Sequence, residues 1–172
     1  PIAYILKART TLRRDMGAAM SPFNAFMFIQ GMETLHLRMK EHSANGQKVA
    51  EHLSKHSMVE RVAYPGTSSG LPKERADKYL SNGCGGLLGF EIKGGHEAGK
   101  KFINSLEMLY HVANIGDSRS LAIHPASTTH SQLNEEELAS GGISSGYIRL
   151  SIGLEHIDDI LADIDQALAK AE

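Results

Sequence analysis

Apolar and polar side chains alternate most clearly in Ile148-Arg149-Leu150-Ser151-Ile152. Because successive side chains of a strand point to opposite faces, this pattern predicts a strand with one apolar face and with Arg149 on the other face. An arginine on a strand is commonly just solvated. A guanidinium fixed on a strand, however, also suits two-point recognition of a carboxylate. The stretch predicts a sheet and offers one candidate binding residue.

Further helices and strands are predicted on the N-terminal side of this stretch and after it. Ser21-Pro22 predicts a helix start, because serine caps free backbone N–H groups and proline suits the first helical position. No proline follows until after His56, so one long helix or two nearly continuous ones are predicted. Helices are also predicted at residues 3–14, 75–80, 96–108 and from 157 onwards, and strands at 59–64, 85–92 and 110–115. The pattern predicts an α/β fold in which a long N-terminal helix precedes a strand-rich layer with helices packed on it.

The composition fits a soluble globular protein of about one domain. The chain has 172 residues, of which 41% are hydrophobic and 22% charged, and its formal net charge is −2. This balance gives no basic surface for nucleic acid, and no apolar run reaches the ~18 residues that a membrane span needs. The single cysteine, Cys84, excludes an internal disulfide and is compatible with a reducing compartment, so we expect a cytoplasmic protein.

Three motifs are too weak to indicate a site by themselves. The spacing from Gly94 to Lys100 imitates a phosphate-binding loop but lacks the final serine or threonine. His52 and His56 are four residues apart on a predicted helix, yet no third metal ligand is evident. Cys84 has no neighbouring histidine that would generate a thiolate. We therefore predict no metal site and no nucleophilic cysteine.

The sequence from residue 116 to 133 is predicted to be a long polar loop between two strands. With the residues just before it, this segment is rich in amide, hydroxyl, imidazole and carboxylate groups. A segment of this length without secondary structure is often functional, although a plain surface loop has the same composition. The residues taken singly thus indicate an α/β domain with a candidate loop and a candidate arginine, and they indicate no reaction.

Several motifs, taken in their order along the chain, resemble the Cys/Met-metabolism family of pyridoxal-phosphate-dependent enzymes. The resemblance extends over nearly all of the chain, and its strongest pieces are Asn114-Ile115-Gly116-Asp117, His124-Pro125-Ala126-Ser127-Thr128-Thr129-His130 and Ile148-Arg149-Leu150-Ser151-Ile152-Gly153-Leu154-Glu155. The family resemblance implies the C-terminal part of a fold-type I transferase, with a mixed sheet that has helices on one face. It further implies that residues 1–56 join a large domain absent from this chain and that residues 57–172 form the small C-terminal α/β domain.

The same resemblance implies where the cofactor and the substrate bind. Pyridoxal 5'-phosphate would be held mainly by the N-terminal part of the enzyme, and because no lysine here matches the family's Schiff-base motif, no catalytic residue is expected in this chain. Four substrate-binding residues are implied. Arg149 would bind the α-carboxylate, Asn114 and the backbone N–H of Ile115 would add donors, and Thr129 would line the cofactor side of the pocket.

Within the family, asparagine at position 114 is typical of the sulfhydrylases, whereas lyases and cystathionine synthases typically carry serine there. The implied reaction replaces the acetate of O-acetylhomoserine by sulfide or a thiol and gives homocysteine or methionine, as part of methionine biosynthesis. A cystathionine γ-synthase or methionine γ-lyase relative, and a fragment without activity of its own, stay open as alternatives. The resemblance also implies a homo-oligomer, most simply a tetramer. The apolar residues of 23–32, which lie on more than one helical stripe, are expected to form an exposed patch in this chain.

Overall fold

A computed structural model describes residues 2–172, without the side chain of residue 135. The chain divides into two compact units, the first ending at His36 and the second comprising Leu37–Glu172. Each unit is described by itself below. No helix among the described residues is both long enough and apolar enough to cross a membrane.

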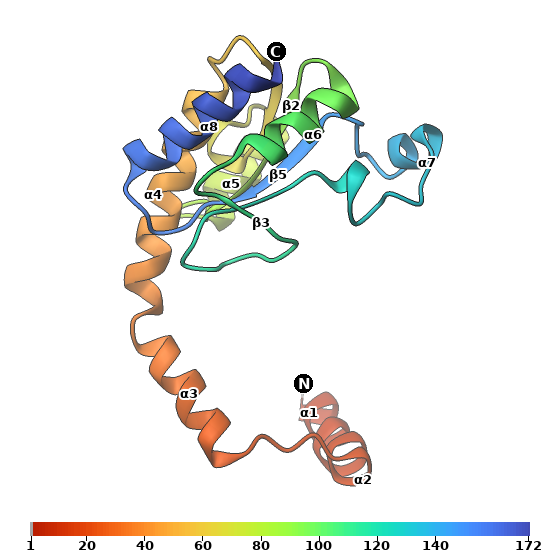
Figure 1. The fold of residues 1–172 in the computed structure, drawn as a ribbon. Coiled ribbons are helices and arrows are strands. Elements are labelled where there is room, and N and C mark those ends of the chain that lie inside the picture. The colour runs from red at the N-terminus through yellow and green to blue at the C-terminus, as the bar shows by residue number, and fades with distance from the viewer. Residues whose placement is uncertain (1) are drawn as a thin grey trace. The chain divides into compact units, whose positions relative to one another are not determined.

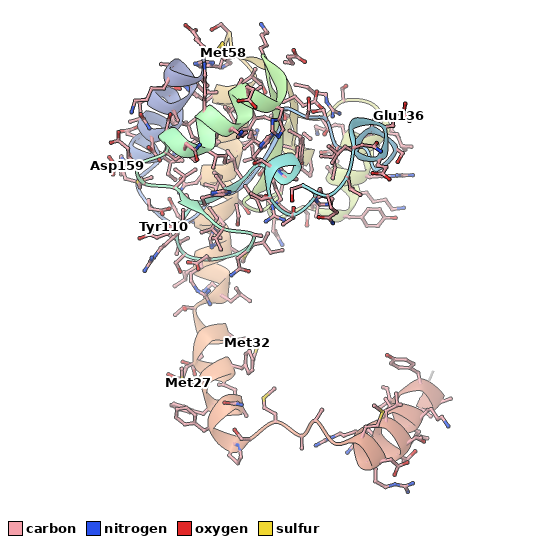
Figure 2. All side chains as sticks on the ribbon, turned by 45° about the vertical axis from the view of Figure 1, so that its right-hand side comes forward. Met27, Met32, Met58, Tyr110, Glu136 and Asp159 are labelled. Atoms are coloured by element: carbon pink, nitrogen blue, oxygen red, sulfur yellow. The ribbon has the colours of Figure 1, made fainter. Side chains whose placement is uncertain are left out.

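The first unit consists of helices whose apolar side chains are exposed. It contains α1 (Ile2–Lys7), a π-helix (Ala8–Arg13), α2 (Arg14–Met16) and α3 (Pro22–Glu33). The predicted start of α3 is confirmed, because the Ser21 hydroxyl accepts a hydrogen bond from the Asn24 N–H at 3.2 Å. No residue of α3 is buried, and Met27 and Met32 project from it with more than half of their surface exposed (Figure 2). An exposed apolar surface on α3 was expected from the sequence, and the structure has it.

Helix α4 (Leu35–Leu53) follows α3 after only one residue, and its second half belongs to the core of the second unit. Val49 and Leu53 are fully buried. A side chain on Gly46 would approach the Gly85 carbonyl oxygen to 2.6 Å, so the absence of a side chain lets α4 lie close to residues 85 and 86. The compact second unit therefore begins within α4, while a domain division at 56/57 stays a prediction.

One five-stranded sheet forms the centre of the second unit, with the strand order β1-β2-β5-β4-β3. The strands are β1 (Val59–Ala63), β2 (Leu87–Ile92), β3 (Tyr110–His111), β4 (Leu121–Ile123) and β5 (Tyr147–Ser151). All neighbouring pairs are antiparallel except β3 and β4, which are parallel, so the sheet is mixed. In this register Arg149 lies opposite Gly89 on one side and Ile123 on the other.

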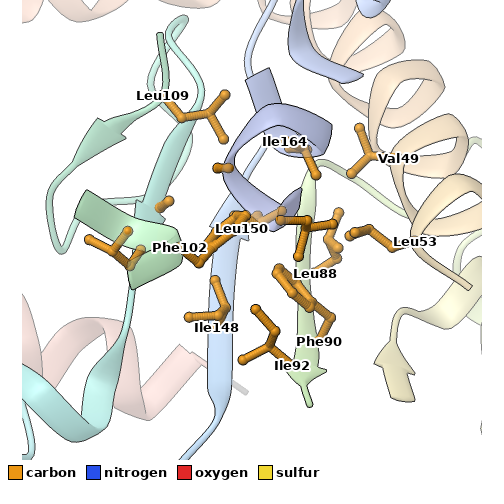
Figure 3. Close-up of a cluster of buried hydrophobic side chains, with 14 of the residues drawn as sticks. Val49, Leu53, Leu88, Phe90, Ile92, Phe102, Leu109, Ile148, Leu150 and Ile164 are labelled. Carbon is orange, nitrogen blue, oxygen red and sulfur yellow. The ribbon is translucent and has the colours of Figure 1, made fainter. Parts of the chain in front are cut away.

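Three helices cover one face of this sheet: α4, α6 (Gly95–Ser105) and α8 (Ile157–Ala171) (Figure 1). The core side chains of β2 and β5 alternate along each strand, and Figure 3 shows Phe90 and Leu150 among them. The ring of Phe90 packs edge-on against the ring of Phe102 from α6, with centroids 5.4 Å apart. The predicted α/β fold with a mixed sheet and helices on one face is confirmed.

The buried carboxylate of Asp163 on α8 fixes the residues that lead into β3. It accepts backbone N–H bonds from Glu107 at 2.8 Å and from Met108 and Leu109 at 2.9 Å. Burial alone would raise the pKa of Asp163, but these N–H groups and the Gln166 amide outweigh it and hold that pKa below its usual value. The negative charge is therefore part of the folded structure.

The predicted long loop at 116–133 is wrong in its middle, because residues 121–123 form β4 and lie in the sheet. All three are buried, and a run of three apolar residues shows no alternation from which a strand could be predicted. The predicted strand at 110–115 is also too long, since only Tyr110 and His111 pair with β4. Helices α5 (Leu71–Tyr79) and α7 (Glu135–Ser140) complete the fold, and α7 was not predicted.

Candidate substrate-binding site

Arg149 lies in the middle of β5, on the sheet face opposite the helical core. Its side chain is half-buried, and one terminal N–H donates to the Asn114 backbone carbonyl at 3.1 Å. The Nε atom of Arg149 is buried and has no hydrogen-bond partner among the residues that the structure describes. A buried donor without a partner costs free energy, so the guanidinium is suited to an additional acceptor such as a carboxylate.

Tyr147, two residues before Arg149, covers the neighbouring part of the same face. A side chain on Gly89 of β2 would collide with the Tyr147 ring and hydroxyl, so the ring lies directly over this glycine. Burial raises the pKa of Tyr147, although the nearby positive charges of Arg149 and Arg61 act in the opposite direction. Tyr147 therefore remains a neutral hydrogen-bonding group at neutral pH, beside the candidate arginine.

The segment 112–120, between β3 and β4, carries two of the predicted residues, Asn114 and Ile115. The Asn114 side-chain oxygen accepts the Ile115 backbone N–H at 2.9 Å, so this N–H is already used in the present structure. Gly116 donates its N–H to the Ser151 hydroxyl at 3.0 Å and has a φ of 75°, a conformation that favours glycine. The structure thus brings Asn114 and Arg149 together, and within the described part of the chain the Asn114 NH₂ group has no hydrogen-bond partner.

Thr129 lies on the segment that follows β4 and a 3₁₀-helix (Pro125–Ser127). It is exposed, its hydroxyl lies 2.8 Å from His130 Nδ1, and it makes no hydrogen bond to Arg149 or Asn114. The four predicted residues therefore do not form one hydrogen-bonded group among the residues that the structure describes.

Buried His124 holds the start of that segment in place. Its Nε2 donates to the Ser145 carbonyl at 2.7 Å, which leaves Nδ1 to accept from the Ser127 hydroxyl at 2.9 Å. Burial lowers the pKa of His124, in agreement with the neutral ring that these bonds require. The imidazole thus has a structural use and does not face the candidate site.

Two of the weaker motifs, at His52 and Cys84, can be located in the described part of the chain. His52 Nε2 forms a hydrogen bond with Asp165 Oδ1 at 2.6 Å. Among the side chains that the structure describes, no group of three or more could bind a metal ion together. Cys84 is a free thiol in the wall of a hollow of about 380 Å³ that is also lined by Ile115 and Gly116. The candidate site around Arg149 offers hydrogen-bond donors that suit a carboxylate.

Sequence reasoning missed Tyr147 on this face, and it placed Ser151 beside Arg149 without giving it a role. Both follow from the alternation that identified Arg149, because residues 147, 149 and 151 share one face of β5. The signal was therefore present in the sequence. Their roles needed the structure, because the partners Gly89 and Gly116 are far away along the chain.

Comparisons with known proteins agree on one family. A family model described as Cys/Met metabolism PLP-dependent enzyme matches residues 3–169. An O-acetyl-L-homoserine sulfhydrylase of Leptospira meyeri is 56% identical over 168 residues, covering 97% of this chain and 38% of the relative. An L-methionine gamma-lyase of Pseudomonas putida is 47% identical, covering 96% of this chain and 42% of the relative.

A solved structure from Campylobacter jejuni has a similar fold. It is described as an O-acetylhomoserine (thiol)-lyase with a pyridoxyl-lysine group at its position 205. It superposes with a TM-score of 0.86 at 45% sequence identity and covers 95% of this chain and 39% of that protein. The chain thus spans about two fifths of the length of the relatives that it matches.

Proposed function

Because the chain belongs to the Cys/Met metabolism family of pyridoxal-phosphate-dependent enzymes, we propose that it is the C-terminal, substrate-binding part of an O-acetylhomoserine sulfhydrylase. Its mixed sheet with helices on one face matches the C-terminal portion of a fold-type I enzyme of this family. The proposed reaction replaces the acetate group of O-acetylhomoserine by sulfide or a thiol. The product is homocysteine or methionine, so the enzyme would be a transferase of amino-acid biosynthesis.

The observation that supports this proposal most is the state of Arg149. Its buried Nε lacks a partner among the described residues, and another N–H donates to the Asn114 carbonyl, so the guanidinium keeps an unused donor beside the Asn114 amide group. An amino-acid substrate has an α-carboxylate that accepts two such N–H bonds at once. We assign carboxylate binding to Arg149 and a supporting donor to the Asn114 NH₂ group.

Ile115 and Thr129 have more peripheral roles in the proposed site. The Ile115 N–H is available to substrate only after it leaves the Asn114 side-chain oxygen, so the two donors act as alternatives. Thr129, exposed on its segment, lines the side of the pocket that faces the cofactor. Together these residues fix the orientation of the substrate, which decides which of its bonds can break.

We assign substrate binding and cofactor binding mainly to different parts of the enzyme. Pyridoxal 5'-phosphate, when bound, supplies an electron sink for the carbanion formed next to the amino group of the substrate. The donors around Arg149 suit the substrate carboxylate, and we place the cofactor's lysine and phosphate contacts mainly in the N-terminal part of the enzyme. This chain alone is then proposed to be inactive, with no catalytic residue of its own.

Substitution of Arg149 in the complete enzyme tests the proposal. A hydrogen bond to a charged group contributes about 1.5–3 kcal/mol, so Arg149→Ala and Arg149→Lys are expected to lower kcat/KM for O-acetylhomoserine by roughly ten- to a hundredfold. The absorbance of the bound cofactor should be unchanged. Arg61→Ala is the matched control, because Arg61 is an exposed strand arginine paired with Glu91 at 2.7 Å. Undiminished kcat/KM in both Arg149 variants would refute the assignment.

A γ-lyase of methionine or a cystathionine γ-synthase is the second candidate function. The similarity to the Pseudomonas lyase favours it, while the higher identity to the Leptospira sulfhydrylase favours the first. Turnover of O-acetylhomoserine with sulfide, compared with breakdown of methionine or cystathionine by the same preparation, separates the two. A preparation that cleaves methionine faster than it consumes O-acetylhomoserine would reverse the order of the two candidates.

The remaining parts of the proposal concern assembly and location. We propose that residues 1–56 join the large domain, that residues 57–172 form the small domain, and that the complete enzyme is a cytoplasmic homotetramer. Helix α3, in which no residue is buried, supports a contact of this region with another part of the assembly. Sedimentation equilibrium of the complete enzyme measures the subunit number, and a monomer would contradict this part.

A further inference from the structure

The segment 112–120 is tied to β5 and its continuation at several points. Asn114 accepts from Arg149, Gly116 donates to Ser151 at 3.0 Å, and the Leu154 N–H donates to the Ser118 carbonyl at 2.8 Å. These contacts recur at every second residue of the segment. The segment that carries Asn114 and Ile115 is thus held by the same part of the chain that carries Arg149.

Glu155 makes the last of these connections, through two hydrogen bonds to Ser120. Its two carboxylate oxygens accept the backbone N–H of Ser120 at 2.7 Å and the Ser120 hydroxyl at 2.9 Å. The Ser120 hydroxyl oxygen in turn accepts the Gly153 N–H at 2.8 Å, and Ser120 is completely buried. A side chain on Gly153 would collide with the Ser118 carbonyl, so the two segments are in close contact here.

The residues around Glu155 are themselves fixed from the opposite side by α4. The Asn45 side-chain amide donates to the carbonyls of Gly153 at 3.2 Å and Glu155 at 3.1 Å. His42 Nδ1 donates to the Ile152 carbonyl at 2.6 Å. Because Asn45 and His42 are both buried, residues 152–155 form a rigid support for whatever Glu155 binds.

From these contacts we propose that Glu155, acting through Ser120, is a positioning residue for the substrate-binding site. It sets the distance of Asn114 and Ile115 from Arg149 without touching the substrate. The proposal rests on the proposed function for its effect on catalysis, whereas the placement of the segment can be measured without any activity.

Two substitutions of Glu155 distinguish the loss of its hydrogen bonds to Ser120 from the loss of its negative charge. Alanine removes both acceptors and leaves the buried Ser120 N–H and hydroxyl without their carboxylate partner. Glutamine keeps one acceptor for the Ser120 N–H, and its NH₂ group can donate to the Ser120 oxygen. We therefore expect Glu155→Ala to release the segment and Glu155→Gln to keep it in place.

Hydrogen exchange of this chain measures the release directly. In Glu155→Ala the backbone amides of Gly116 and Ser120, which are the hydrogen-bonded amides that link the segment to β5 and to Glu155, should exchange at least about tenfold faster. The amides of β2 and β5 should keep their protection. Leu168→Ala is the control for a general loss of stability. Leu168 is a completely buried core residue of α8, and its side chain has no group that could form a hydrogen bond to the segment. Equal exchange of the Gly116 amide in Glu155→Ala and the parent chain would overturn the proposal.

Kinetics of the complete enzyme measure the consequence. Glu155→Ala should raise KM for O-acetylhomoserine by about tenfold or more while the cofactor absorbance stays unchanged. The KM of Glu155→Gln should stay within about threefold of the parent value. Leu168→Ala should lower the melting temperature without raising KM. An unchanged KM in Glu155→Ala, or an equal rise in the Leu168 variant, would overturn the positioning role. Absence of sulfhydrylase turnover in the parent enzyme would refute the proposed function alone, because the exchange result stands independently of it.

Discussion

Removal of the Asp163 carboxylate should destabilise the second unit by an amount that depends on what replaces it. The carboxylate accepts the N–H groups of Glu107, Met108 and Leu109, and a hydrogen bond to a charged group contributes about 1.5–3 kcal/mol. The carboxylate also accepts from the Gln166 amide at 3.0 Å, but that amide still has the Ser105 carbonyl as a partner. Water can reach the N–H of exposed Glu107, so only the bonds from Met108 and Leu109 are lost without replacement. Asp163→Ala is therefore expected to lower the free energy of unfolding by about 3–6 kcal/mol.

Asp163→Asn should cost less, about 1–2 kcal/mol, because its single oxygen can still accept from Met108 and Leu109 while its NH₂ group faces the Glu107 N–H. Urea unfolding at pH 7, followed by circular dichroism, measures both values. Asp159→Asn is the matched control, since Asp159 is an exposed carboxylate on the same helix. An Asp163→Ala variant as stable as this control would refute the reasoning.

The pH dependence of the same variants provides a second check. The folded-state pKa of Asp163 lies below its unfolded value of about 3.9, so its stabilising effect is complete above that value and is lost as pH falls through the folded-state pKa. The stability difference between the parent chain and Asp163→Asn should therefore be constant from pH 7 to about pH 5 and shrink below about pH 4. A difference that stays constant down to pH 3 would show that the charge is not involved.

Three further predictions concern other parts of the chain. Gly89→Ala should destabilise by about 1–3 kcal/mol, because the new methyl group collides with Tyr147, and thermal melts should show that Tyr147→Ala removes most of this penalty in the double variant. Burial raises the pKa of Tyr64 to about 12, so ultraviolet titration should count the same number of tyrosines ionising below about pH 11 in Tyr64→Phe as in the parent chain. The exposed apolar surface of α3 should make this chain associate, and Phe28→Glu should weaken that association in sedimentation velocity, whereas identical sedimentation of the two would contradict it.

The sheet was predictable where side chains alternate and unpredictable where they do not. β5 separates an apolar from a polar face and was found from the sequence, whereas β4 is buried at all of Leu121, Ala122 and Ile123 and resembles any short apolar run. Helix α7 has a usable sequence signal in Asn134 and Glu137, which form a capping box. Strength of pattern, rather than importance for the fold, decided which elements were found.

Only part of the candidate site was predictable from the residues themselves. Arg149 stands out from its strand pattern alone, while Asn114, Ile115 and Thr129 were identified only by family resemblance. The contact between Ser120 and Glu155 joins residues 35 positions apart, and no periodicity connects them. Contacts of this kind depend on which distant segments the fold brings together. No local pattern in a single sequence indicates these pairs.

The position of β5 in the middle of the sheet has a consequence for mutational scanning. Ile148 and Leu150 are completely buried in the core, whereas Tyr147, Arg149 and Ser151 lie on the proposed substrate face. In a library of single variants scored separately for protein abundance and for growth without methionine, substitutions at the even positions should lower abundance and growth together. Substitutions at Arg149 should lower growth while the protein accumulates normally. Along this strand the two scores should therefore diverge at every second residue.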